Sequence, residues 1–200
     1  MLSGDDAYKI LKKSFRSAAE KYEKWSDGSW LSDAGVESVI QTEAAERFFE
    51  TGKCFVTLET SPWTAREWDA ELPKEKLEHI SDTSRFDICV WGKCTGLTGI
   101  IEIKRSLEAW QQSKDMARMN EMMSVYGRKS GGNLRYAMVG MYLWGKNSEA
   151  LRKAEKNAQC RFAEFEKNHD NSYFGTYKIK PVDESLWKGW KQSVAIAYFA

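Results

Sequence analysis

Residues Ser84–Lys104, which read SRFDICVWGKCTGLTGIIEIK, decide the fold of this chain. Apolar and polar side chains alternate on both sides of a turn that contains glycine, a pattern typical of two antiparallel strands. We expect the strands to span Arg85–Trp91 and Thr98–Lys104. In the first strand, alternation places Phe86, Ile88 and Val90 on one face. In the second strand, it places Ile101 and Ile103 on one face. The stretch therefore predicts a hairpin at the centre of a sheet.

The polar side chains of this hairpin are expected to gather on one face. Symmetric folding pairs Trp91 with Thr98 and therefore places Asp87 opposite Glu102, with Cβ atoms about 4.5–5.5 Å apart. Lys104 points to the same side because it follows Glu102 by two residues. Two opposed carboxylates weaken a sheet, and a hard cation such as Mg²⁺ between them relieves the repulsion. The alternative interpretation is a set of solvated residues on the open face of a two-layer sheet.

Length and composition favour a single soluble globular domain. The chain has 200 residues, of which 42% are hydrophobic and 30% charged, and its formal net charge is +1. Such a chain suits one domain over residues 1–200 with one core, and it lacks a global basic field for nucleic acid. Four cysteines without C-x-x-C spacing and only two histidines argue against a structural zinc site. With no run of 18 apolar residues and no signal peptide, we expect a cytoplasmic protein that does not enter a membrane.

Two helices are expected before the hairpin, over Asp5–Trp25 and Ser32–Thr51, because apolar residues recur in both at helical spacing. Glu43 lies on or beside the inward stripe of the second helix, with Glu46 about one turn further on. An acid on an inward face costs stability unless a partner satisfies it. The other interpretation of Glu43 is a boundary glutamate that reaches solvent.

The segment between these helices and the hairpin is expected to contain one strand and one loop. Lys53–Thr60 has the alternation of a strand, and the polar stretch Ser61–Asp82 is interpreted as a loop with a short helix near Lys74–Ile80. Trp63 and Trp68 are expected in the core, and stacking on nucleic-acid bases is the alternative.

After the hairpin, the sequence predicts a helix and then a buried strand. The helix is expected over Leu107–Tyr126, with a methionine stripe that fills the core. Gln112, one turn inside this helix, either reaches back toward the carboxylates or is a boundary amide. Leu134–Trp144 is almost continuously apolar, which suits a strand buried on both faces after a parallel crossover.

The remaining residues, 147–200, are expected to pack on this core as an extension. They comprise a charged helix over Ser148–Asn168, a strand over Ser172–Val182 and an apolar tail. The tail packs either on the body of the chain or on a second subunit. We expect a homodimer formed through Val194–Ala200, and closure of the monomer's own core is the alternative.

Taken in order, the chain shows a helix with Glu43, a strand, a strand with Asp87, a strand with Glu102-Ile-Lys104, a helix and a buried strand. This order and the E-x-K motif resemble the PD-(D/E)XK, or restriction-endonuclease-like, nuclease superfamily over about residues 32–144. The resemblance implies an α/β fold with a central mixed sheet, of order α-β-β-β-α-β, flanked by helices. Two positions depart from the family pattern: Phe86 replaces the proline before the Asp, and Met116 replaces a tyrosine found in recombination-type members.

The resemblance also implies a function, which is Mg²⁺-dependent hydrolysis of phosphodiester bonds in DNA, with Mn²⁺ able to substitute. The implied catalytic residues are Asp87, Glu102, Lys104, Glu43 and Gln112. The implied metal ligands are Asp87, Glu102, Ile103 and Glu43, with Glu46 in reserve for Glu43. Two other functions stay open at this point: a nuclease-fold domain that has lost catalysis and binds nucleic acid or protein, and a ribonuclease.

Overall fold

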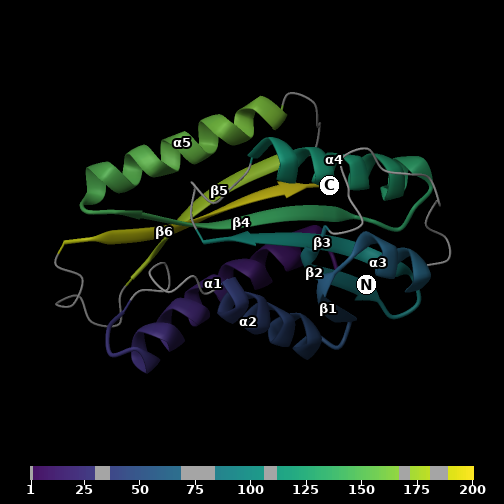
Figure 1. The fold of residues 1–200 in the computed structure, drawn as a ribbon, viewed down its shortest axis with the longest axis horizontal. Coiled ribbons are helices and arrows are strands. Elements are labelled where there is room, and N and C mark those ends of the chain that lie inside the picture. The colour runs from purple at the N-terminus through teal and green to yellow at the C-terminus, as the bar shows by residue number, and fades with distance from the viewer. Residues whose placement is uncertain (1, 30–36, 69–83, 106–111, 167–171, 181–188) are drawn as a thin grey trace.

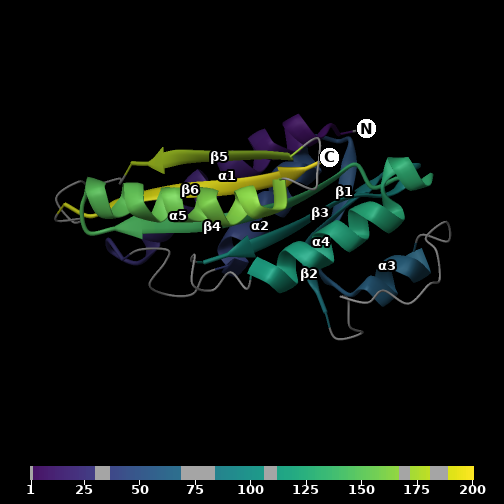
Figure 2. The same ribbon diagram turned by 90° about the horizontal axis from the view of Figure 1, so that it is seen from above.

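A computed structural model describes residues 2–29, 37–68, 84–105, 112–166, 172–180 and 189–200 of the chain. Helices cover both faces of one six-stranded mixed sheet, whose strand order is β1-β2-β3-β4-β6-β5 (Figures 1 and 2). The expectation of a mixed α/β fold with a central mixed sheet flanked by helices is therefore confirmed.

The described helices are α1 (Gly4–Trp25), α2 (Glu37–Glu50), α3 (Pro62–Trp68), α4 (Gln112–Tyr126) and α5 (Ser148–Glu166), with a 3-10 turn η1 (Arg128–Ser130). The strands are β1 (Cys54–Thr60), β2 (Phe86–Gly92), β3 (Gly96–Lys104), β4 (Tyr136–Gly145), β5 (Ser172–Ile179) and β6 (Lys191–Phe199). Among these elements, α3, η1 and the strand β6, which forms from the apolar tail, are absent from the sequence expectation. The short helix expected near Lys74–Ile80 lies outside the described residues.

Helices α1 and α2 form one outer layer of the fold. The α1 helix begins where Ser3 accepts a hydrogen bond from the Asp6 backbone amide at 3.1 Å, a standard N-cap. Its buried face includes Ala7, Leu11, Phe15 and Ala18, spaced three or four residues apart. These side chains share one core cluster with the apolar stripe of α2 and with one face of β2, β3 and β4.

Helices α4 and α5 cover the opposite face of the sheet (Figure 2). The methionine stripe of α4 is core, as expected, with Met116, Met119 and Met122 buried against Ile100 and Leu97. The α4 helix also makes the crossover between β3 and β4, which run parallel to each other, so the prediction of a buried parallel strand is confirmed. This crossover places α4 directly over the polar residues of the hairpin.

The pairing of β2 with β3 contains a β-bulge. Ile88 pairs with Ile101 and Val90 with Gly99, but Trp91 pairs with Leu97. Thr98 is the extra residue, and its hydroxyl donates to the Val90 carbonyl at 3.0 Å. The expected Trp91–Thr98 pair is therefore wrong by one residue. Beyond the bulge the register is the predicted one.

The C-terminal tail forms β6, which pairs with β4 on one side and β5 on the other. Its apolar residues Val194–Ala197 are fully buried within the chain's own sheet. The alternative in which the tail closes the monomer's core is thus the one observed, and the homodimer expected from this tail loses its structural basis.

Two further expectations concern exposure. Trp68 is 58% exposed, so its placement in the core is wrong; its ring contacts that of Trp91 at 5.7 Å between centroids. The side chain of Trp63 lies outside the described part. Within the described ranges, none of the helices combines the length and the apolar character that a membrane crossing needs.

Candidate functional site

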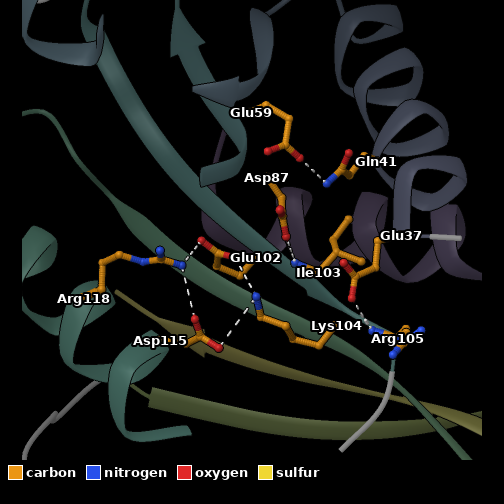
Figure 3. Close-up of polar contacts among 10 residues, drawn as sticks. All are labelled: Glu37, Gln41, Glu59, Asp87, Glu102, Ile103, Lys104, Arg105, Asp115 and Arg118. Atoms are coloured by element: carbon orange, nitrogen blue, oxygen red, sulfur yellow. Dashed lines mark hydrogen bonds and ion pairs between the residues drawn. The ribbon is translucent and has the colours of Figure 1, made fainter. Parts of the chain in front are cut away.

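Asp87 and Glu102 lie opposite each other on β2 and β3. The paired residues of the two strands end at Ile88–Ile101, and Asp87 and Glu102 are the next residues beyond that pair. The Asp87 carboxylate also accepts a hydrogen bond from the Ile103 backbone amide, which holds it against β3 (Figure 3). The two carboxylates that the sequence predicted to face each other are therefore together.

Glu102 is the buried centre of a charged cluster that we call the carboxylate cluster: Asp87, Glu102, Lys104, Asp115 and Arg118. The Glu102 side chain is only 1% exposed, and Lys104 Nζ lies 3.0 Å from its Oε2. Arg118, on α4, donates to the other Glu102 oxygen, Oε1 (Figure 3). Both oxygens of the most buried carboxylate are thus paired with cations of the chain.

Asp115 completes the cluster from α4. Its Oδ1 lies 3.3 Å from Arg118 Nη2, and its Oδ2 lies 3.7 Å from Lys104 Nζ. The Oδ2 atom is buried and accepts no hydrogen bond within the described part of the chain. Buried carboxylate oxygens are normally satisfied, so this atom indicates a site where a further donor, water or cation is favourable.

Burial and like charge perturb the ionisation of this cluster. Burial, and then the Asp87 carboxylate, raises the pKa of Glu102 to about 8. Burial also raises the pKa of Asp87. Burial lowers the pKa of Lys104, but the carboxylates of Glu102 and Asp115 outweigh that effect and raise it. The cluster therefore disfavours two adjacent negative charges and retains a protonated lysine.

Arg118 is positioned by packing as well as by charge. Its guanidinium carbon lies 5.3 Å from the centre of the Phe86 ring, within cation–π range. Phe86 was expected on the face of Ile88 and Val90, but it packs on the other face, in the cluster beneath α4. This placement gives Arg118 an apolar platform next to Glu102.

Glu43 and Glu46 do not join the carboxylate cluster within the described residues. Glu43 is buried between α1 and α2, where it pairs with Lys21 and with Arg47 at 2.9 Å. Although burial raises its pKa, the hydrogen bonds from Lys21, Ser17 and Arg47 outweigh burial and lower it. Glu46 is exposed at 60% and lies 4.0 Å from Lys21 Nζ. Both acids face α1.

Other residues of α2 lie on the side of the hairpin. Glu37 accepts a hydrogen bond from the Arg105 backbone amide at 2.9 Å, directly after β3. Gln41, one turn on and buried, donates to Glu59 Oε1 at 2.9 Å (Figure 3). Residues 37 and 41 share a helix face, whereas 43 is rotated by about 200° from 41. The α2 helix therefore directs the side-chain amide of Gln41, and not the carboxylate of Glu43, toward β1 and β2.

Glu59 adds a third carboxylate to the row formed by Asp87 and Glu102. The pairs Leu58–Ile88 and Thr60–Phe86 place Glu59 opposite Asp87, so carboxylates occur at the same level of β1, β2 and β3 (Figure 3). Glu59 has a φ of 51°, in the left-handed region that residues with a side chain rarely adopt. Such strain is characteristic of functional sites.

Gln112 is the first residue of α4 and precedes Asp115 by one helical turn. Its backbone therefore lies at the end of α4 nearest to the cluster. Its side chain lies outside the described part.

The donor chemistry of the cluster suits a hard divalent cation. Mg²⁺ takes oxygen ligands and is usually held by one or two protein carboxylates, with water and substrate phosphate in its other positions. Asp87 and Glu102 supply such a pair, next to the unsatisfied Oδ2 of Asp115. Among the described residues, no group of three or more His, Cys, Asp or Glu side chains is arranged to hold a metal ion. The carboxylate pair alone therefore does not form a closed, all-protein cage.

Sequence reasoning missed Asp115, Arg118, Gln41 and Glu59. Asp115 and Arg118 are three residues apart beside the methionine stripe, a spacing that places them on one face of α4. That spacing was available, but the partner of the face depends on where the crossover lays α4. For Glu59, the unusual backbone conformation has no signature in the residue type.

Comparison of the chain with family models, with curated proteins and with solved structures gave no match.

Proposed function

We propose that this chain is a metal-dependent nuclease that hydrolyses phosphodiester bonds in DNA. The observation that carries the proposal is the contact between Lys104 Nζ and Glu102 Oε2 at 3.0 Å, with Asp87 opposite Glu102. This arrangement gathers two carboxylates and an ammonium group from the motif D-x14-E-x-K on neighbouring strands.

The arrangement of the surrounding elements supports the same proposal. Among the described elements, α2, β1, β2, β3, α4 and β4 follow one another with α3 and the turn η1 inserted, and β1 to β4 are adjacent in that order in the sheet. This is the α-β-β-β-α-β order expected for a restriction-endonuclease-like core.

The proposed metal ion is Mg²⁺, held by Asp87, Glu102 and the backbone of Ile103. When bound, such an ion lowers the pKa of water and polarises a phosphoryl oxygen. The orphaned Oδ2 of Asp115 would accept a hydrogen bond from a water molecule at the edge of the same site. Glu59, exposed beside Asp87, lies where it could orient a further water molecule.

In this proposal, Lys104 supplies the positive charge that acts on the scissile phosphate. Its side chain is partly exposed at 17%, whereas the Glu102 side chain is buried. A lysine at this position neutralises charge that develops on the scissile phosphate and donates hydrogen bonds to it. Arg118 acts indirectly in this proposal, because it pairs with Glu102 and Asp115 and so fixes their positions.

A second candidate function is a nuclease-fold domain without catalysis that binds nucleic acid or protein. One observation favours it: Lys104 and Arg118 already pair with both oxygens of Glu102, so the chain neutralises this carboxylate without a metal ion. In the nuclease proposal, a bound ion must displace at least one of these two contacts.

The experiment that tests the function is a cleavage panel. Linear, circular and single-stranded DNA and an RNA of the same sequence are incubated with the protein in Mg²⁺, in Mn²⁺ and in EDTA. We expect DNA cleavage with either metal, none with EDTA, and none by Asp87→Asn. Glu50→Gln, which removes an exposed carboxylate from the end of α2, should cleave like the wild type. Cleavage of RNA alone would assign a ribonuclease, and metal-independent binding without cleavage would favour the second candidate.

A further inference from the structure

A second polar region lies away from the carboxylate cluster, where the end of α4 meets both termini of the described chain. A pocket of about 530 Å³ opens there. The lining residues that matter here are Met123, Arg128, Lys129, Leu134, Arg135 and Tyr198. We call this cavity the basic pocket.

The charge of the basic pocket is uncompensated within the described residues. Arg128, Lys129 and Arg135 line it, and no carboxylate side chain among the described residues does so. None of the three cations forms an ion pair with a described residue. The Arg135 Nε atom is buried and has no hydrogen-bond acceptor in that part of the chain. Burial, and then the nearby Arg128, lowers the pKa of Arg135. A bound anion would balance the charge of these cations and would supply an acceptor for Arg135 Nε.

Backbone hydrogen bonds hold the loop that carries these cations in place. Leu134 donates to the Tyr126 carbonyl at 2.9 Å, and Arg135 donates to the Thr98 carbonyl at 2.9 Å. Gly131 adopts a φ of 82° and closes the turn η1 by donating to the Arg128 carbonyl at 3.0 Å. The loop is therefore organised before a ligand binds, which reduces the ordering cost of binding.

The basic pocket also has apolar and aromatic lining residues. Met123, Leu134 and Tyr198 line it together with the three cations. Tyr198 is held close to the N-terminus of α1, since a Cβ added at Gly4 would lie 2.1 Å from its hydroxyl oxygen. A cavity lined by both cations and aromatic and apolar side chains fits a phosphate joined to a flat, partly apolar group.

We propose that the basic pocket binds one nucleotide of the DNA strand on which the candidate site acts. The phosphate lies between Arg128, Lys129 and Arg135, and the sugar or base lies against Tyr198 and Leu134. The identity of the ligand as DNA rests on the proposed nuclease function. The pocket goes beyond that function, because none of its residues belongs to the carboxylate cluster.

The position of the pocket agrees with a substrate anchor. Glu102 is level with Val139 in the parallel β3–β4 pair, and Arg135 precedes Val139 by four residues. Four residues of strand span about 13 Å, which is about the axial length of four nucleotides in B-form DNA. A DNA strand that is held in the basic pocket and follows β4 toward Glu102 would reach the cluster within about four nucleotides.

The test measures binding in EDTA, so that it does not depend on cleavage. The probe is a short, fluorescently labelled DNA strand with a 5′-phosphate, and fluorescence anisotropy gives its dissociation constant. Arg128→Gln/Lys129→Gln removes two exposed cations, and Arg152→Gln/Lys156→Gln removes the same charge from the exposed face of α5. We expect at least a tenfold loss of affinity, equivalent to about 1.4 kcal/mol, for the first variant and no change for the second.

Competition defines the ligand chemistry. A deoxynucleoside monophosphate should displace the labelled strand from the wild type at lower concentration than either inorganic phosphate or the unphosphorylated nucleoside. Arg135→Lys keeps the charge but loses the planar guanidinium, and should weaken this competition. Equal loss of affinity in both double variants, or equal competition by inorganic phosphate and nucleotide, would overturn the proposal. Nucleotide binding that depends on Arg128 and Lys129 in a protein that cleaves no DNA would leave the pocket standing and reject the nuclease function alone.

Discussion

Asp87 and Glu102 face each other across the β2–β3 hairpin, and the Asp87 carboxylate accepts the amide hydrogen of Ile103. The pair lies at the point where α4 crosses the sheet, so that Arg118 and Asp115 close over it. Like-charged groups in such proximity destabilise a sheet unless cations balance them.

Metal binding should stabilise the fold through Asp87. At a free Mg²⁺ concentration of 100 Kd, binding to the native state alone contributes about 2.7 kcal/mol, or a rise in Tm of about 5–10 °C for a domain of this size. Asp87→Asn should lose this rise, since it removes a ligand charge. Differential scanning fluorimetry with and without Mg²⁺ measures the effect.

The matched control for that measurement is Glu43→Gln. Glu43 pairs with Lys21 and Arg47 between α1 and α2, so its loss should lower stability without changing the response to Mg²⁺. A full metal-induced shift in Asp87→Asn would place the ion elsewhere. Loss of the shift in Glu43→Gln would restore the assignment of Glu43 as a ligand.

Arg118 should be a stabilising residue that sequence reasoning overlooked. Arg118→Met keeps an unbranched apolar stem but leaves Glu102 and Asp115, both buried, with Lys104 as their remaining cation. Breaking a buried ion pair in this way costs about 3–5 kcal/mol. Urea unfolding measures the loss, and Lys114→Met, at an exposed position of the same helix, should change stability by less than about 0.5 kcal/mol. Equal stability of the two variants would show that Lys104 alone compensates the carboxylates.

We expect the strained backbone conformation of Glu59 to contribute to cleavage at the site. Its φ of 51° is unfavourable for a residue with a side chain by about 1 kcal/mol or more, and glycine has no such penalty. Glu59→Gly should therefore fold with unchanged or slightly higher stability, while cleavage falls at least tenfold, or by about 1.4 kcal/mol in activation free energy.

Asp27 provides a matched control, because it has a φ of 52° in the turn after α1. Asp27→Gly should relieve the same kind of strain and leave cleavage unchanged. If Glu59→Gly cleaves DNA at the wild-type rate, Glu59 has no part in the site.

Much of the fold was predictable because its signals are local. The alternation in the hairpin and the apolar run of β4 each lie within a short stretch, and both elements formed where expected. The bulge at Thr98 was not predictable from alternation. Near the turn Trp91 pairs with Leu97 and not with Thr98, and the bulge offsets this difference of one residue, so that the register beyond it is the expected one.

The site was only partly predictable because its remaining residues depend on long-range packing. Helical spacing placed Glu43 beside an inward stripe, but it could not say whether that side of the helix faces α1 or the sheet. In the structure, Glu43 pairs with Lys21 on α1, whereas Gln41 lies toward β1. In the same way, Trp68 has an apolar ring that composition favours in a core, although its short helix lies at the surface.

The measurement that tests the central claim most directly is single-turnover DNA cleavage by Lys104→Met in saturating Mg²⁺, beside the wild type and Lys114→Met. Lys104→Met removes the ammonium group while Arg118 still pairs with Glu102. We predict a rate at least a hundredfold lower, a loss of about 2.7 kcal/mol of transition-state stabilisation, with the metal-induced rise in Tm retained. A folded Lys104→Met protein that cleaves within about threefold of the wild-type rate, a difference of less than 1 kcal/mol, would contradict the account.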